Sequence, residues 1–214
     1  MPTNFPTSVD NFTNPTANDS LNLPSHSTQH ANANDAIEAV EDYLLNGVGK
    51  NGLIPVSTTT FTTQSSVALD NVFTTAYSNY VMHITYAGTN AQGLKAVYRT
   101  TGSADVATGY YWGFVYTNNG SGPTRAGGVG VTNFELGTVG TGTGGTMHVS
   151  TIGDIALATS TKHQLNNFAQ FGAEIEAANG GNVNVNATAY AGIRFYVSTG
   201  TITGTARIYG VRNS

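Results

Sequence analysis

The stretch Tyr110-Tyr111-Trp112-Gly113-Phe114-Val115-Tyr116 decides the fold class of this chain. Four aromatic residues occupy alternate positions, so in an extended strand they share one face, while Tyr111, Gly113 and Val115 share the other. Aromatic side chains supply much of the apolar area in the core of a small domain. The face with four rings is therefore expected to pack against a second layer.

Similar runs rich in Thr, Val, Tyr, Phe and Ile continue from Val56 onward, separated by Gly and Asn. Asn118-Asn119-Gly120 and Asn179-Gly180-Gly181 are typical of tight turns, and residues 137–145 predict a flexible loop. Many short strands at this spacing predict a mainly β fold, an antiparallel β-sandwich or jelly roll. Strands are expected over residues 58–63, 66–73, 80–86, 94–101, 110–116, 132–136, 146–150, 163–169, 173–178, 183–190, 193–197 and 203–211.

The composition excludes several classes of function. Charged residues make up 9% of the 214 residues, against about 25% in an ordinary soluble domain. A net charge of −4 argues against nucleic-acid binding, which needs clustered Lys and Arg. No apolar run approaches the roughly 18 residues of a membrane span, and the N-terminus does not have the pattern of a signal peptide. The absence of cysteine excludes thiol catalysis, thiolate metal sites and disulfides.

The charge is unevenly distributed along the chain. Residues 1–49 hold six acidic and no basic residues, whereas residues 50–214 hold eight basic and six acidic ones, a net +2. This asymmetry indicates parts with different roles. We expect three: an extended docking arm (1–31), a short amphipathic helix with its cap (32–49), and a β-sandwich domain (50–214).

The arm contains four prolines and follows no helical or strand period. Phe5 and Phe12 stand among these prolines as apolar anchors. Ordering such a segment requires an external surface to offset its conformational entropy. The arm is therefore predicted to dock on another protein.

The helix is expected over residues 33–45, with Asn32 or Asn34 as its N-cap and Gly47 just beyond its end. Its apolar positions fall at i, i+3 and i+7 and form one narrow stripe. A three-turn helix is marginal alone, so this stripe needs a partner surface, either the β body or neighbouring copies of the chain. The stripe consists of Ile37, Val40 and Leu44.

The run from His26 to Glu41, HSTQHANANDAIEAVE, resembles a segment near the N-termini of tailed-bacteriophage virion proteins. There an H-x-x-Q-H element leads into an N-D-A-I-x-A-(I/V)-E helix placed before a β-rich domain. The ending GTITGTARIYG, residues 200–210, is similar to the last strands of phage appendage proteins. The pattern Val72-Phe73 followed by Tyr77-Ser78-Asn79-Tyr80 is similar to the front of their β domains.

This resemblance implies a non-enzymatic structural role in the virion, often as a homotrimer attached through its N-terminus to other virion proteins. It implies neither catalytic residues nor cofactors. The expected function is an arm-anchored appendage, a tail or neck fibre, that displays the sandwich for contact with the host surface. A capsid decoration protein is the alternative within this class. The residues expected at partner or subunit contacts are Phe5, Phe12, His26, His30, Ile37, Val40 and Leu44.

His26 and His30 are four residues apart, the spacing of paired zinc ligands on a helix. The glutamate of an H-E-x-x-H motif is absent, so we expect them to form hydrogen bonds at a subunit contact. A metal shared by three copies around a three-fold axis is the alternative.

A carbohydrate-binding module is the alternative from another functional class. If the face bearing Trp112 were exposed, its flat rings would suit stacking on sugars. The opposite face, with Tyr111, is a second candidate for glycan contact.

No enzymatic site is expected. Glu174 and Glu176 share one face of a predicted strand, as a glycosidase pair would, but Ala173, Ile175 and Ala177 alternate with them. The glutamates are therefore predicted to face solvent. No G-x-S-x-G elbow accompanies the separated histidines and aspartates of the body. These are His83, His148, His163, Asp70, Asp105 and Asp154.

Overall fold

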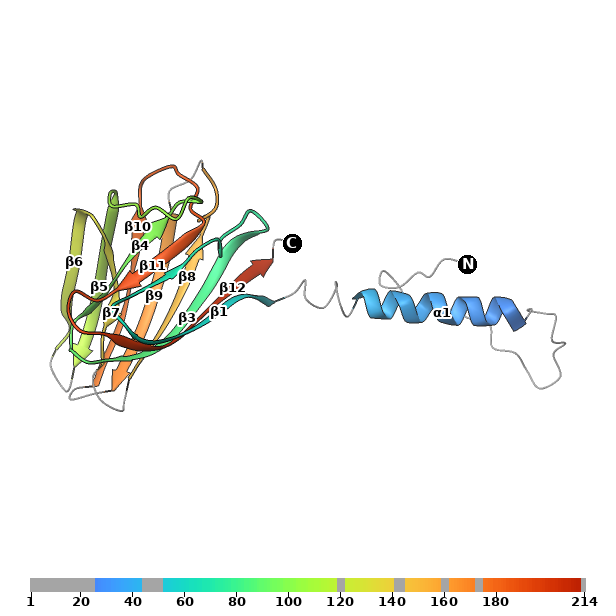
Figure 1. Ribbon diagram of the computed structural model, residues 1–214, viewed down its shortest axis with the longest axis horizontal. Helices are drawn as coiled ribbons and strands as arrows, with labels where there is room; N and C mark the ends of the chain where they lie inside the picture. The colour runs from blue at the N-terminus through green and yellow to red at the C-terminus, as the bar shows by residue number, and fades with distance from the viewer. Residues whose placement is uncertain are drawn as a thin grey trace. The chain divides into compact units, whose positions relative to one another are not determined.

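The computed structural model describes residues 26–43, 52–118, 122–140, 145–158, 162–171 and 175–212. The chain divides into two compact units (Figure 1). One comprises residues 1–52 with Ser214 and contains the helix α1, and the other comprises residues 53–213 and contains the β body.

Helix α1 spans His26–Asp42 and is longer than the sequence predicts. It begins seven residues before residue 33, so Asn32 and Asn34 lie inside the helix and the predicted N-cap is wrong. The segment Ser27–Ala31 contains neither Gly nor Pro, so nothing in it stops the helix from extending back toward Pro24.

Twelve strands in the described part of the β body form two antiparallel sheets. The eight-stranded sheet has the order β1-β12-β3-β8-β9-β10-β5-β6, and the four-stranded sheet has the order β2-β11-β4-β7. This arrangement confirms the predicted mainly β, sandwich-type fold. The strands are β1 (Leu53–Gln64), β2 (Ser66–Leu69), β3 (Tyr77–Gly88), β4 (Gly93–Arg99), β5 (Tyr110–Asn118), β6 (Thr124–Val131), β7 (Phe134–Thr138), β8 (Thr146–Gly153), β9 (Lys162–Phe171), β10 (Ile175–Asn184), β11 (Gly192–Tyr196) and β12 (Ile202–Arg212).

The core lies between the two sheets and is rich in aromatic rings. Tyr98 on β4 is fully buried, and its ring centroid lies 5.2 Å from that of Phe134 and 5.2 Å from that of Tyr190. Tyr110 and Phe114 are also buried, and the half-buried rings of Trp112 and Tyr116 pack against the core. The predicted core role of the four-ring face of β5 is therefore confirmed.

Strands β8, β9 and β10 turn polar side chains inward. Gln164 on β9 donates from Nε2 to Oγ of Ser150 at 2.9 Å and to Oδ1 of Asn166 at 2.6 Å. The Tyr98 hydroxyl donates to Oε1 of Gln164 at 2.9 Å and lies 3.3 Å from Oδ1 of Asn182. All five side chains are at least nine-tenths buried, so hydrogen bonds join the two sheets on this side of the core.

This inward polarity overturns the expectation for β10. Glu176 is buried and Ala177 is exposed, the reverse of the predicted arrangement, because the interior accepts polar side chains here. Glu174 lies outside the described residues.

The predicted turn at Asn179-Gly180-Gly181 is also wrong, because β10 runs through it without a break. A Cβ atom at Gly180 would lie only 2.1 Å from the backbone oxygen of Gly113 on β5. The close approach of neighbouring strands, rather than a turn, requires glycine at this position.

Two other loop predictions change. Strand β6 occupies residues for which no strand is predicted, and Gly137 and Thr138 belong to β7, although residues 137–145 were predicted as a loop. Residues 119–121 and 141–144 lie outside the described residues.

Strand β1 forms one edge of the eight-stranded sheet (Figure 1). Its pairing with β12 is interrupted between Pro55 and Ser57 and again between Phe61 and Gln64. Within the second irregularity Thr63 has a positive φ of 51°. The edge strand is therefore bulged at two places.

Candidate functional site

A groove of ≈370 Å³ crosses the outer face of the eight-stranded sheet, over β9, β10, β5 and β6. The outer positions of these strands alternate with the buried ones, so the groove lies on the side away from the core. Its lining includes Tyr111, Gly113, Val129, His163, Leu165 and Gly181.

The register aligns three glycines across this face of the sheet, two of which, Gly113 and Gly181, line the groove. Gly113 on β5 is opposite Gly181 on β10 and opposite Gly127 on β6. Gly181 is in turn opposite Leu165 on β9. Because three neighbouring positions have no side chain, the sheet surface is hollow at this point.

The three positions differ in whether the neighbouring strands leave room for a side chain. A Cβ at Gly181 would lie 2.6 Å from the backbone oxygen of Gln164, and one at Gly127 would lie 2.8 Å from that of Trp112. A Cβ at Gly113 would meet only the backbone oxygen of Ala126, at an ordinary 3.7 Å. Packing of the strands therefore excludes side chains at residues 127 and 181, whereas at residue 113 a side chain fits and would fill the groove.

The walls of the groove are apolar and open to solvent. Tyr111 is 40% exposed, Leu165 67% and Val129 81%. The described lining contains no Asp, Glu, Lys or Arg. A ring beside a shallow, uncharged floor suits a neutral ligand with a flat apolar face, such as the C–H face of a pyranose.

Trp112 does not share this exposed surface. Its ring packs on the core side of β5, with its centroid 5.9 Å from that of Phe114, and a Cβ at Gly128 would lie 2.6 Å from its Nε1. The structure therefore separates the two residues predicted for glycan contact: Tyr111 faces the groove and Trp112 faces the core.

A second pocket, of ≈280 Å³, brings together two carboxyl groups that the sequence did not pair. Glu135 on β7 and Glu176 on β10 line it beside the rings of Phe114 and Phe168. Burial raises the pKa of Glu135, against the opposing effect of the Lys95 ammonium. Oε1 of Glu176 accepts a hydrogen bond from Oγ1 of Thr138 at 3.2 Å.

Of the histidines considered for catalysis, His148 contacts a serine. Its Nε2 is hydrogen-bonded to Oγ of Ser150, which donates to Oδ1 of Asn166 at 2.7 Å. Both His148 and Ser150 are fully buried, and desolvation by burial lowers the pKa of His148 to about 3. The pair lies inside the core among amide side chains.

Asp70 and Asp105, the aspartates considered with these histidines, form ion pairs elsewhere. Arg99 on β4 donates from Nε to Asp70 at 2.6 Å and from Nη1 to Asp105 at 2.8 Å. Arg194 on β11 also contacts Asp105, and its guanidinium lies 4.5 Å from the ring centroid of Tyr196. These ion pairs lie on the outer face of the four-stranded sheet, where Asp105 joins the arginines of β4 and β11.

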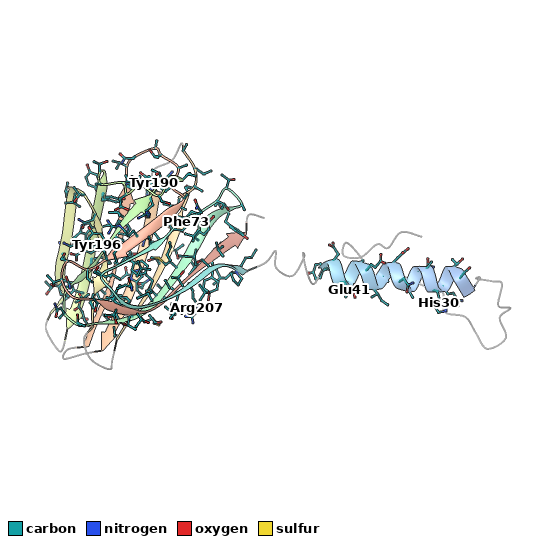
Figure 2. The ribbon with its side chains drawn as sticks, viewed as in Figure 1. His30, Glu41, Phe73, Tyr190, Tyr196 and Arg207 are labelled. Atoms are coloured by element: carbon teal, nitrogen blue, oxygen red, sulfur yellow. The ribbon has the colours of Figure 1, made fainter. Side chains whose placement is uncertain are left out.

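On α1, the described apolar stripe is exposed. Ile37 is 56% exposed and Val40 41%. His30 projects from the same helix (Figure 2), and His26 lies in its first turn. The other predicted contacts, Phe5, Phe12 and Leu44, lie outside the described residues.

Among the described residues, no group of three or more His, Asp or Glu side chains is arranged to hold a metal ion. Over the same residues, none of the helical structure has the length and apolar character needed to cross a bilayer.

Comparisons of the chain with protein-family models, curated proteins and solved structures find no match.

Proposed function

We propose that the chain is a non-enzymatic structural protein of a tailed-bacteriophage virion, an arm-anchored appendage of tail- or neck-fibre type that displays a β-sandwich. The observation that carries the proposal is the division of the chain into a β-sandwich and an N-terminal unit whose helix leaves Ile37 and Val40 exposed. The resemblance of residues 26–41 to phage virion proteins supports the same assignment.

The helix is proposed to join copies of the chain. Most of the stability of a protein helix comes from packing of its apolar face rather than from intrinsic propensity. In α1 that face consists of Ile37 and Val40, continued in sequence by Leu44, and helical geometry places the acidic residues Asp35 and Asp42 opposite it. Three copies would bury these stripes against one another, while Phe5 and Phe12 of the arm anchor the assembly to another virion protein.

The solution mass tests this proposal. Light scattering is expected to give a trimer for the full chain and a monomer for a chain that starts at Gly49. Monomers in both cases would contradict helix-driven assembly. Counting copies in purified virions separates a fibre, with few copies at one vertex, from a capsid decoration protein, which occupies many equivalent sites.

The outer-face groove favours a second function, carbohydrate binding. The specific observation is the exposed Tyr111 ring beside the row of glycines on β6, β5 and β10. In an appendage, this groove would supply the contact with host-surface glycans. Screening of the full chain on a glycan array tests it, and an array without a binder would count against this role.

A further inference from the structure

Lys162 is a buried lysine on the inner face of the eight-stranded sheet. It is the first residue of β9, its side chain has no solvent exposure, and its Nζ donates to the backbone oxygen of Leu157. Lysine is rarely buried completely, because an ammonium ion loses its hydration there. Burial lowers the pKa of Lys162, which favours the neutral amine, the nucleophilic form of this side chain.

Asn184, the last residue of β10, lies directly opposite Lys162. The antiparallel register pairs the two residues, and both side chains are fully buried. Directly opposed residues in such a ladder have Cβ atoms about 4.5–5.5 Å apart. The four-carbon stem of a lysine is long enough to span that gap, so a rotamer change that releases Nζ from Leu157 would bring the amine to the carboxamide.

Three neighbours fix the carboxamide of Asn184. Its Oδ1 accepts hydrogen bonds from the hydroxyl of Tyr190 at 2.9 Å and from the backbone N–H of Asn186 at 3.0 Å. Its Nδ2 donates to the backbone oxygen of Thr108 at 3.0 Å. Two donors on one carbonyl oxygen stabilise the negative charge that develops there when a nucleophile attacks the carbon.

We propose that Lys162 and Asn184 join in an intramolecular isopeptide bond. The Nζ lone pair attacks Cγ of Asn184, the bond from Cγ to Nδ2 breaks, and Nδ2 leaves as ammonia with the proton that Nζ gives up. The reaction neither oxidises nor reduces either residue and needs no further reactant. The Asp154 carboxylate, which acts electrostatically on Lys162, is assigned the transfer of that proton.

The bond would remove the cost of burying the Lys162 side chain as an ammonium ion, because an amide carries no charge. It would also link the start of β9 to the end of β10 in a chain that has no cysteine for a disulfide. Like a disulfide, such a link stabilises the fold mainly by restricting the unfolded chain.

Intact mass spectrometry of the purified full chain tests the proposal. After allowance for removal of the initiator Met, the expected mass is lower than the sequence mass by one ammonia. The variant Lys162→Met should recover its full sequence mass. The matched variant Asn182→Ala, on the same strand and face as Asn184 but opposite Gln164, should retain the deficit.

Tryptic peptides locate the bond and exclude the main alternative source of ammonia loss. A succinimide at Asn179-Gly180 would also lose ammonia, but it would leave Lys162 open to trypsin, giving peptides 126–162 and 163–194. The isopeptide bond blocks that cleavage and yields one peptide, residues 126–194, lighter by one ammonia.

A wild-type chain of full sequence mass that is cleaved after Lys162 would overturn the proposal, and this result needs no variant to fold. The purified variant Asp154→Asn should contain unlinked chain of full sequence mass that trypsin cleaves after Lys162. A variant as fully linked as the wild type would overturn the role assigned to Asp154.

Discussion

The hydroxyl of Tyr98 on β4 donates a hydrogen bond to Oε1 of Gln164 on β9 at 2.9 Å, so a single phenol connects the two sheets through the core. Asn182 on β10 presents its Oδ1 to the same hydroxyl at 3.3 Å. The sandwich is therefore held by directional contacts as well as by apolar area.

Replacing Tyr98 by Phe should destabilise the β body. The substitution keeps the ring and removes the donor, leaving buried amide oxygens without it, which typically costs about 1–3 kcal/mol. Denaturant unfolding measures this loss. The matched variant Tyr111→Phe, at an exposed ring, should change stability by less than about 0.5 kcal/mol. Equal stabilities of the two variants would contradict the bridging role of Tyr98.

The trimer proposal predicts the effect of charge on the helix stripe. Ile37→Asp and Leu44→Asp each place a carboxylate in the proposed seam, where burial of an unpaired charge is strongly unfavourable. Light scattering should show monomers. The control Glu38→Gln, at an exposed position on the side of α1 away from the stripe, should leave the assembly unchanged. An oligomer that survives both aspartate variants would show that another surface joins the copies.

Gly113→Leu tests the groove without disturbing the strands, because a Cβ fits at this position. The leucine side chain should fill the floor beside Tyr111 and abolish binding of any glycan found on the array, with unchanged unfolding. Gly181→Ala is the contrasting variant, since its Cβ would clash with the backbone of β9 and lower the stability of the fold. Undiminished glycan binding by Gly113→Leu would place the glycan elsewhere.

The buried His148 predicts a pH dependence of stability. Its pKa in the folded chain is about 3, below the unfolded value near 6.5, so between these values the unfolded chain takes up a proton that the folded chain does not. Stability contributed by neutral His148 is therefore complete above pH 6.5 and declines below it, with a slope approaching about 1.4 kcal/mol per pH unit.

Urea unfolding of the wild type and His148→Asn between pH 7 and pH 5 checks this, since most carboxyl groups titrate at lower pH. The variant should be less stable at pH 7 but should show a shallower decline. Parallel profiles would assign the decline to other groups.

The sequence predicted most strands because apolar and polar residues alternate along them. Tyr110 and Phe114 fall at alternate positions of an aromatic run, and both are core residues. Strand β6 was missed because Gly127, Gly128 and Gly130 interrupt its pattern, yet backbone pairing with β5 needs no side chain.

The groove could not be predicted because it depends on register. Gly113, Gly181 and Gly127 are far apart or unremarkable in sequence, and only the pairing of three strands aligns them. The wrong prediction for Glu176 has a different cause. Alternation shows which residues share a face of a strand, but it does not show which face is buried when the interior also contains amide and carboxyl side chains.

The two bulges of the edge strand β1 affect how readily the sandwich pairs with the sheet of another copy. A straight edge exposes a row of N–H and C=O groups that a neighbouring sheet can pair with, and the proposed appendage would hold several copies close together. Pro55 removes one donor, and the two irregularities of β1 bend the rest out of line. This edge is therefore a poor template for strand addition, as the proposed association of copies through α1, rather than through their sheets, requires.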